Sequence, residues 1–129
     1  MFILRSFIVS AGITSLGGVV DSANLDATKG VTLVPDRKIA LVTSYNLHKL
    51  SAYSYEDANN LELLSSVADS TLMLNARGVS YDNTRDMAVV SARHGNSLTT
   101  IDLSDTSSMT ILGSVSSSTY LDRTHTSCL

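Results

Sequence analysis

Short apolar runs separated by polar turns cover most of the chain, and they recur at a fixed spacing. In the first unit, these runs predict strands near residues 30–34, 38–44, 49–54 and 61–67. The second unit predicts the same four strands 48 residues later, near residues 78–81, 86–92, 97–103 and 109–115. Laid over each other without a gap, the two units agree at 12 of 48 positions. A period of about 40–50 residues that holds four short strands is typical of β-propeller blades.

The second strand of each unit is a nearly continuous apolar run, at residues 39–42 and 87–90. Such a strand is expected to be covered on both faces. A four-stranded blade cannot cover both of its own faces, so it needs a neighbouring blade on either side. We therefore expect an all-β fold made of propeller blades of four antiparallel strands. This chain alone would form a partial propeller that does not close.

The N-terminal region continues the repeat. Residues 13–19 lie one period before residues 61–67 and two periods before residues 109–115. The chain is therefore expected to be one partial propeller domain over residues 1–129, made of a half blade (1–24), a blade (30–77) and a second blade (78–125). Known propellers close with about four to eight blades. We expect that the chain is a fragment of a larger protein, or that copies self-associate to supply the missing blades. The incomplete first blade favours the fragment.

A second interpretation exists for the N-terminus. Residues 1–23 are apolar enough to resemble a secretory signal peptide, with small residues around Ser22 and Ala23. On that interpretation the protein is secreted or at the cell surface. A signal peptide has no reason to match a blade strand in register, so the sequence favours the repeat.

Composition and charge narrow the classes of partner. The net charge is −3, with 9 Lys and Arg residues against 12 Asp and Glu residues and no basic stripe, so we expect no nucleic-acid partner. No lysine-rich amphipathic helix or uninterrupted long apolar run points to a membrane. The single cysteine, Cys128, excludes an intramolecular disulfide and a Cys-x-x-Cys zinc site.

One stretch carries a family resemblance. Leu98-Thr-Thr-Ile-Asp-Leu-Ser-Asp105, followed by Ile111-Leu-Gly-Ser-Val115, resembles the LVIVD repeat. The better match covers residues 78–117, and the chain also resembles lactonase-like and YVTN-type propellers. The motif is structural, with Asp105 and Ser104 expected to cap the turn between the third and fourth strands. The resemblance implies a β-propeller fold and no activity.

Propeller ligands usually sit near the central channel, on the face made by the loops between second and third strands and by the links between blades. Here that face would carry residues 45–48 and 93–96 and the links near Lys29, Arg77 and residues 123–125. The candidate ligand-face residues are His48, Arg93, His94 and Arg77, which suit an anionic ligand or a metal. The alternative is that they are solvated loop residues. Three histidines without an acidic cluster argue against a metal site, so we expect no metal and no cofactor.

Two aspartates follow the predicted fourth strands at the repeat spacing. Asp21 and Asp69 lie 48 residues apart, and Ser117 occupies the third equivalent position. We expect each to cap its own turn. The alternative is a set of carboxylates on one face of the propeller.

These observations favour a non-catalytic repeat module that binds a protein or a carbohydrate. No phosphate-binding loop, nucleophile elbow or His-Glu-x-x-His motif occurs, and no catalytic residue is assigned. The alternative is part of a lactonase- or dehydrogenase-like propeller enzyme, with His48, His94 and Arg93 around the channel. A third hypothesis is a truncated gene product without function.

Overall fold

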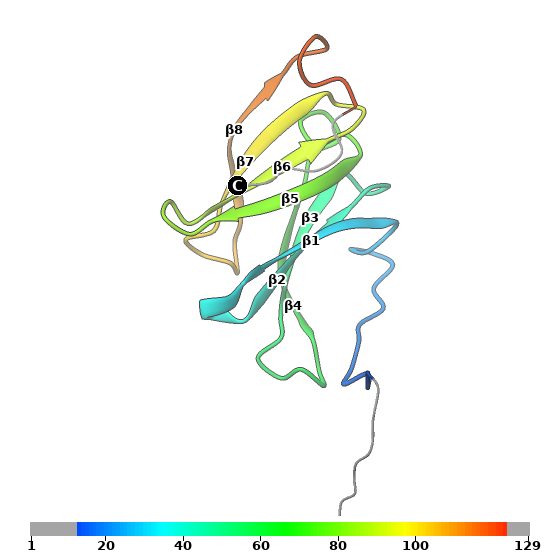
Figure 1. Cartoon of the computed structure of the whole chain (residues 1–129), viewed down its shortest axis with the longest axis vertical. Helices are drawn as coiled ribbons and strands as arrows, with labels where there is room; N and C mark the ends of the chain where they lie inside the picture. Colours follow the sequence, from blue (N-terminus) through cyan, green and yellow to red (C-terminus); the bar gives the residue numbers. More distant parts are fainter. Residues whose placement is uncertain (1–12, 124–129) are drawn as a thin grey trace, which may run out of the picture.

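The computed structural model describes residues 13–123, which form two four-stranded antiparallel sheets (Figure 1). The strands of each sheet follow one another in sequence order. The first sheet contains β1 (Thr28–Val34), β2 (Ile39–Ser44), β3 (Lys49–Ser54) and β4 (Glu62–Ala68); the second contains β5 (Ala76–Asp82), β6 (Met87–Ala92), β7 (Ser97–Asp102) and β8 (Thr110–Ser116). A single 3-10 turn, η2 (Pro35–Arg37), joins β1 to β2. The expected all-β partial propeller is confirmed.

The first strand of each sheet begins earlier than the apolar pattern predicts. β1 starts two residues before Gly30, and β5 starts two residues before Gly78. A register shift separates these extra residues from the regular ladder, since Thr28 pairs with Ser44 before the irregularity and Val31 pairs with Val42 after it. The same shift recurs between Ala76 and Gly78. The bulge allows Thr28 and Ala76 to pair as strand residues although they lie outside the apolar run that predicts the strand.

The backbone repeats with the sequence. Among residues 13–123, seven residues other than glycine have a positive φ, and all seven fall in sets spaced by 48 residues: Lys38 and Asp86; His48 and Asn96; Ala27, Asn75 and Arg123. These positions end a strand connection or a link between blades. A left-handed residue costs energy in most contexts, so its recurrence marks a turn that the fold requires. The repeat therefore extends beyond the strands into the links.

The two sheets meet along their first strands. β1 runs beside β5, and β2 also approaches β5 (Figure 1). Between the sheets lies an aliphatic core, with Leu41 and Leu50 of the first sheet and Val90 and Ile101 of the second, all fully buried. Sheets that are closest along the first strand have the arrangement of neighbouring propeller blades.

Polar contacts fasten both rims of this junction. The Thr43 hydroxyl donates to the carbonyl of Arg77 at 2.8 Å and accepts the N–H of Gly30 at 2.9 Å. At the opposite rim, Arg37 forms an ion pair with Asp86 and donates to the carbonyl of Leu103 at 2.8 Å. Gly30 is needed because a Cβ there would lie 2.5 Å from the Arg77 carbonyl oxygen. The inner strands can approach this closely only when one of them lacks a side chain.

The N-terminal region departs from the prediction. Residues 13–20 form no strand, in contrast to the strand expected at residues 13–19, and residues 1–12 lie outside the described part of the chain. A strand needs a hydrogen-bonding edge, and no described strand pairs with residues 13–20. The segment nevertheless lies where the repeat predicts: Gly17 packs on the carbonyls of Ala58 and Asn59, and one period later the Ser65 hydroxyl donates to the Thr106 carbonyl. The assignment of residues 1–24 to a half blade stays a prediction.

Candidate functional site

The loops between second and third strands and the links between blades lie at one rim of the molecule. β2 ends and β3 begins at this rim, and the antiparallel register places the start of β1 and the end of β4 beside them. The second sheet repeats this arrangement. We call this the link rim, made of residues 21–29, 45–49, 69–77, 93–97 and 117–123. It is the face that the sequence predicts for ligand binding.

Backbone hydrogen bonds hold each loop of the link rim to a link. The N–H of Tyr45 donates to the Ala27 carbonyl and the N–H of Arg93 donates to the Asn75 carbonyl, both at 3.1 Å. The N–H of Asp69 donates to the His48 carbonyl at 3.0 Å, and Ser117 makes the equivalent bond one period later. The rim is therefore a fixed platform rather than a set of independent loops.

His48 has a structural partner. Its Nδ1 accepts the backbone N–H of Asn75 at 2.9 Å. One period later, Asn96 Oδ1 accepts the N–H of Arg123 at 3.1 Å, so an amide does the same work as the imidazole. A nitrogen that accepts cannot carry a proton, so neutral His48 holds its proton on Nε2. The alternative interpretation of His48 as a loop residue with a local role fits these contacts.

His94 belongs to a network centred on Asn75. The Asn75 amide donates from Nδ2 to the Tyr45 carbonyl at 3.0 Å, and this bond directs Oδ1 toward His94 Nδ1, 2.7 Å away. His94 Nδ1 therefore carries a proton, and Nε2 of the neutral ring is the acceptor. The Tyr45 hydroxyl lies 3.1 Å from the same Nδ1, and the two rings meet edge to face with centroids 6.0 Å apart. His94 itself is exposed.

Several cations share the link rim with this network. Lys29 Nζ lies 5.4 Å from the centroid of the Tyr45 ring, within reach of a cation–π interaction. Arg77 occupies the position equivalent to Lys29, one period later. Arg93 is partly buried, and its Nε has no hydrogen-bond partner. The structure thus places all four predicted residues on one rim and joins His48 and His94 through Asn75.

Sequence reasoning missed Asn75 and gave no individual role to Tyr45 or Lys29. One signal for Asn75 was available. It lies 48 residues after Ala27, at the last position of a link, and asparagine tolerates the left-handed backbone that such a position requires. Its amide then has free donors and an acceptor with which to connect two loops that are 49 residues apart in the sequence (Tyr45 and His94).

The aspartates of the links cap turns, as expected. Asp69 Oδ1 accepts the N–H groups of Thr71 and Leu72 at 2.8 and 2.9 Å, and these two bonds hold the pKa of its carboxyl below the usual value. Asp21 accepts from the side chain of Asn24, which is the main cause of its lowered pKa, and from the hydroxyl of Tyr53. Burial, and then the Asp21 carboxylate, raise the pKa of Tyr53. No set of converging carboxylates forms at these positions.

Comparison with solved structures supports the same architecture. The chain is similar to the crystal structure of a protein from Lactobacillus plantarum, with 19% identity and a TM-score of 0.59 over 69% of this chain. It is also similar to a functionally unknown protein from Desulfotomaculum acetoxidans, with 14% identity and a TM-score of 0.57 over 67% of this chain. The chain covers 26% of each of these structures. At such identities the likeness shows a β-propeller-like fold alone.

No protein-family model matches the chain, and no curated protein sequence matches it. The resemblance to the LVIVD repeat therefore stays a prediction. Within residues 13–123, no helix is long and apolar enough to cross a membrane, and no group of three or more His, Cys, Asp and Glu side chains is placed to hold a metal ion.

Proposed function

We propose that the chain is a non-catalytic propeller module, part of a larger assembly of blades, and that the link rim binds a protein partner with an acidic surface. The observation that carries this proposal is the uneven charge of the two rims. The link rim holds five cations against four carboxylates. The opposite rim, made of residues 35–38, 54–62, 82–87 and 102–110, holds three cations against eight carboxylates. The link-rim cations are Lys29, Lys49, Arg77, Arg93 and Arg123; those of the opposite rim are Arg37, Lys38 and Arg85.

Several carboxylates of the link rim are already occupied. Asp21 and Asp69 accept hydrogen bonds from their own turns, and Asp26 accepts from the Asn46 amide at 3.3 Å. Lys29 and His94 are exposed beside Tyr45. A positive patch on a chain of net negative charge attracts an acidic surface and orients it during the encounter.

The side chains of the link rim suit a protein interface. Tyrosine and arginine are enriched among the residues that dominate binding energy at interfaces. Asn75 binds the Tyr45 carbonyl, and His94 contacts the Tyr45 hydroxyl and ring. Tyr45 therefore loses little conformational entropy when a partner binds. Preorganisation of this kind favours binding over chemistry, because both imidazoles are engaged through Nδ1 in contacts that fix loops.

Binding to immobilised acidic peptides tests the proposal, with an array of neutral and charged glycans as the second probe. Lys29→Glu should weaken peptide binding by about fivefold or more, since it reverses a charge at the interface. Arg85→Glu is the matched control because Arg85 is exposed on the opposite rim and pairs only within its own turn, with Asp82. Circular dichroism checks that both variants fold.

Equal effects of the two variants would contradict the assignment of the link rim. Binding to neutral glycans alone would replace the protein partner by a carbohydrate. Turnover of a lactone panel that is lost in His94→Ala would replace the binding module by the enzyme alternative.

A further inference from the structure

Each sheet leaves one face open. β1–β4 turn one face toward the second sheet and leave the other uncovered over Val31, Leu33, Val42 and Leu63, which we call the first open face. β5–β8 leave uncovered the face that carries Val89, Leu98, Leu112 and Val115, which we call the second open face. It is equivalent to the face of the first sheet that is buried between the two sheets. Most of the exposed large apolar side chains within the strands belong to these two faces.

The apolar residues of the second open face have equivalents in the first sheet that are buried. Val89 and Leu98 are only half-buried, whereas their equivalents Leu41 and Leu50 are fully buried against the second sheet. Val115 is 57% exposed, whereas its equivalent Val67 packs against the core. A shallow pocket lined by Val89, Leu98, Thr100, Gly113, Ser114 and Val115 marks the place that a neighbouring sheet would fill.

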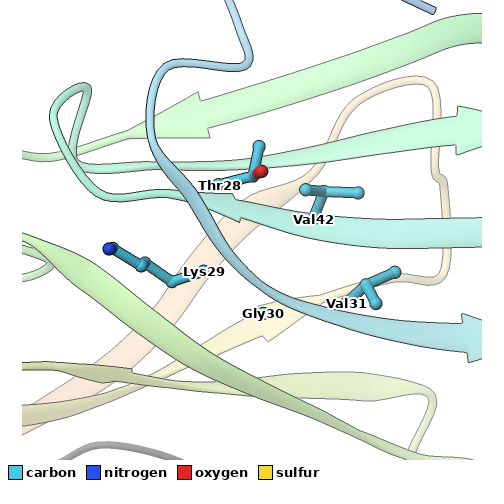
Figure 2. Close-up of a pocket in the computed structure, with 5 residues that line it drawn as sticks. All are labelled: Thr28, Lys29, Gly30, Val31 and Val42. Atoms are coloured by element: carbon cyan, nitrogen blue, oxygen red, sulfur yellow. The ribbon is translucent and has the colours of Figure 1, made fainter.

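The first open face shows the reverse: its apolar residues have equivalents in the second sheet that are buried. Val31 is 64% exposed, whereas its equivalent Val79 is 7% exposed because the first sheet covers it. Val42 is half-buried and its equivalent Val90 is fully buried. Figure 2 shows Val31 and Val42 beside each other at a pocket near the start of β1, with the Lys29 side chain extending away from them.

We propose that the first open face of one copy binds the second open face of another, so that copies join head to tail. This interface repeats the junction that β1–β4 and β5–β8 already form within one chain, and this continuity is the reason to assign a second copy as the occupant. The inference goes beyond the proposed function, because it concerns the open faces rather than the exposed side chains of the link rim. Contacts of this kind between unlike patches produce rings or filaments.

The equivalent polar contacts can form at the new junction. Ser91 stands one period after Thr43, and its hydroxyl accepts the Gly78 N–H at 3.2 Å as Thr43 accepts that of Gly30. Its proton would then go to the Lys29 carbonyl of the second copy, as that of Thr43 goes to the Arg77 carbonyl. Exposed apolar side chains on two complementary surfaces favour this association.

Two features make this junction weaker than the one within the chain. The pair of Arg37 and Asp86 would be replaced by Arg85 facing Lys38 of the second copy, which are like charges. Residues 13–20 of the second copy would also occupy the place of β8 of the first, since the two segments are equivalent and share four of seven residues over 13–19 and 109–115. The link at residues 21–27 of the second copy would likewise meet its equivalent, residues 117–123 of the first. Residues 13–20 form no strand, so they move aside when the junction forms, and one of the two links moves with them.

Sedimentation velocity over a range of concentrations tests the proposal with one variant for each face. Leu98→Glu blocks the second open face and Val31→Glu blocks the first, and each alone should weaken association about tenfold or more because it buries an unpaired charge. A mixture of the two should form a one-to-one complex and nothing larger, since one intact face of each kind remains. Ser108→Glu, in the exposed turn between β7 and β8 and away from both open faces, should associate as the wild type does.

Three results would overturn the proposal: a wild-type chain that stays monomeric throughout, a single-face variant that associates as the wild type does, or a mixture that forms no one-to-one complex. If circular dichroism shows that Leu98→Glu does not fold, Thr100→Glu blocks the same face from a neighbouring position. Lys38→Asp adds a gain-of-function arm. It should strengthen association by up to about fivefold, because it restores the carboxylate that Asp86 supplies to Arg37.

Discussion

Leu50 and Leu98 are the same residue at equivalent positions of two blades, yet one is fully buried and the other is half-exposed. Both lie in the third strand, and both pair with a valine of the fourth strand, Val67 and Val115. Only the neighbouring sheet differs. The comparison teaches that a blade does not bury its own apolar residues: the next blade does. Predictions that alter a covered position and its open equivalent therefore test the arrangement of the two sheets.

The largest expected effect comes from truncating this leucine pair. Leu50→Ala should lower the free energy of unfolding by about 2–5 kcal/mol, because it removes buried methyl groups and leaves a cavity. Leu98→Ala should lower it by about 1 kcal/mol or less, because part of the side chain is already in water. Urea denaturation of both variants measures the difference. Equal losses would mean that the second sheet does not cover the first.

The next largest effect is expected where β1 and β5 approach most closely. Gly30→Ala should cost about 1–3 kcal/mol, since its Cβ would meet the Arg77 carbonyl at 2.5 Å and push the inner strands apart. Gly18→Ala is the control, because a Cβ there meets nothing within 4 Å. Thermal unfolding followed by circular dichroism compares the two variants. A neutral Gly30→Ala would contradict the close approach of the inner strands.

A smaller effect distinguishes an ion pair between the sheets from one within a turn. Arg37, in the turn between β1 and β2, binds Asp86 and Leu103 of the second sheet. Arg85 pairs with Asp82 in its own turn. Arg37→Gln should cost about 1 kcal/mol and Arg85→Gln a few tenths, because exposed pairs contribute little. Urea denaturation at low and high salt measures both. The assignment fails if Arg85→Gln has the larger effect.

The smallest effect is a pH dependence at a link. Because hydrogen bonds lower the pKa of Asp69 in the folded chain, its ionised form stabilises the fold above the usual value of 3.8. That stabilisation is lost as the pH falls through the lowered pKa. Asp69→Ser keeps an acceptor, as Ser117 does for the N–H of Tyr120, but cannot titrate. The loss of stability between pH 6 and pH 3 should be smaller in Asp69→Ser, and an unchanged loss would contradict the cap.

The strands could be predicted because the period reports on two units at once. The runs at residues 39–42 and 87–90 support each other, and β2, β3, β6 and β7 lie within a residue of their expected bounds. The bulges that extend β1 and β5 could not be predicted, since they depend on pairing with Ser44 and Ala92 rather than on an apolar pattern. Residues 13–19 show the reverse error: the pattern of a strand is present, but no described strand offers it an edge.

The candidate site was predictable only in outline. The repeat places His48, Arg77, Arg93 and His94 on one rim, because the equivalent loops and links of the two blades lie there. The repeat also shows that the two histidines hold different loop positions, because His48 is equivalent to Asn96 and His94 to Asn46. It does not show which contacts each imidazole makes. The network through Asn75 depends on side-chain hydrogen bonds across blades, and a one-dimensional pattern carries no information about these.

The central claim is that the two sheets are neighbouring propeller blades that meet along β1 and β5. The most direct test is a nuclear Overhauser effect between the Hα protons of Gly30 and Gly78 in the labelled chain, since these two glycines lie against each other at the junction. Our account predicts a strong cross-peak there and none between the middle residues of β4 and β8. A missing glycine cross-peak, or strong contacts between β4 and β8, would contradict it.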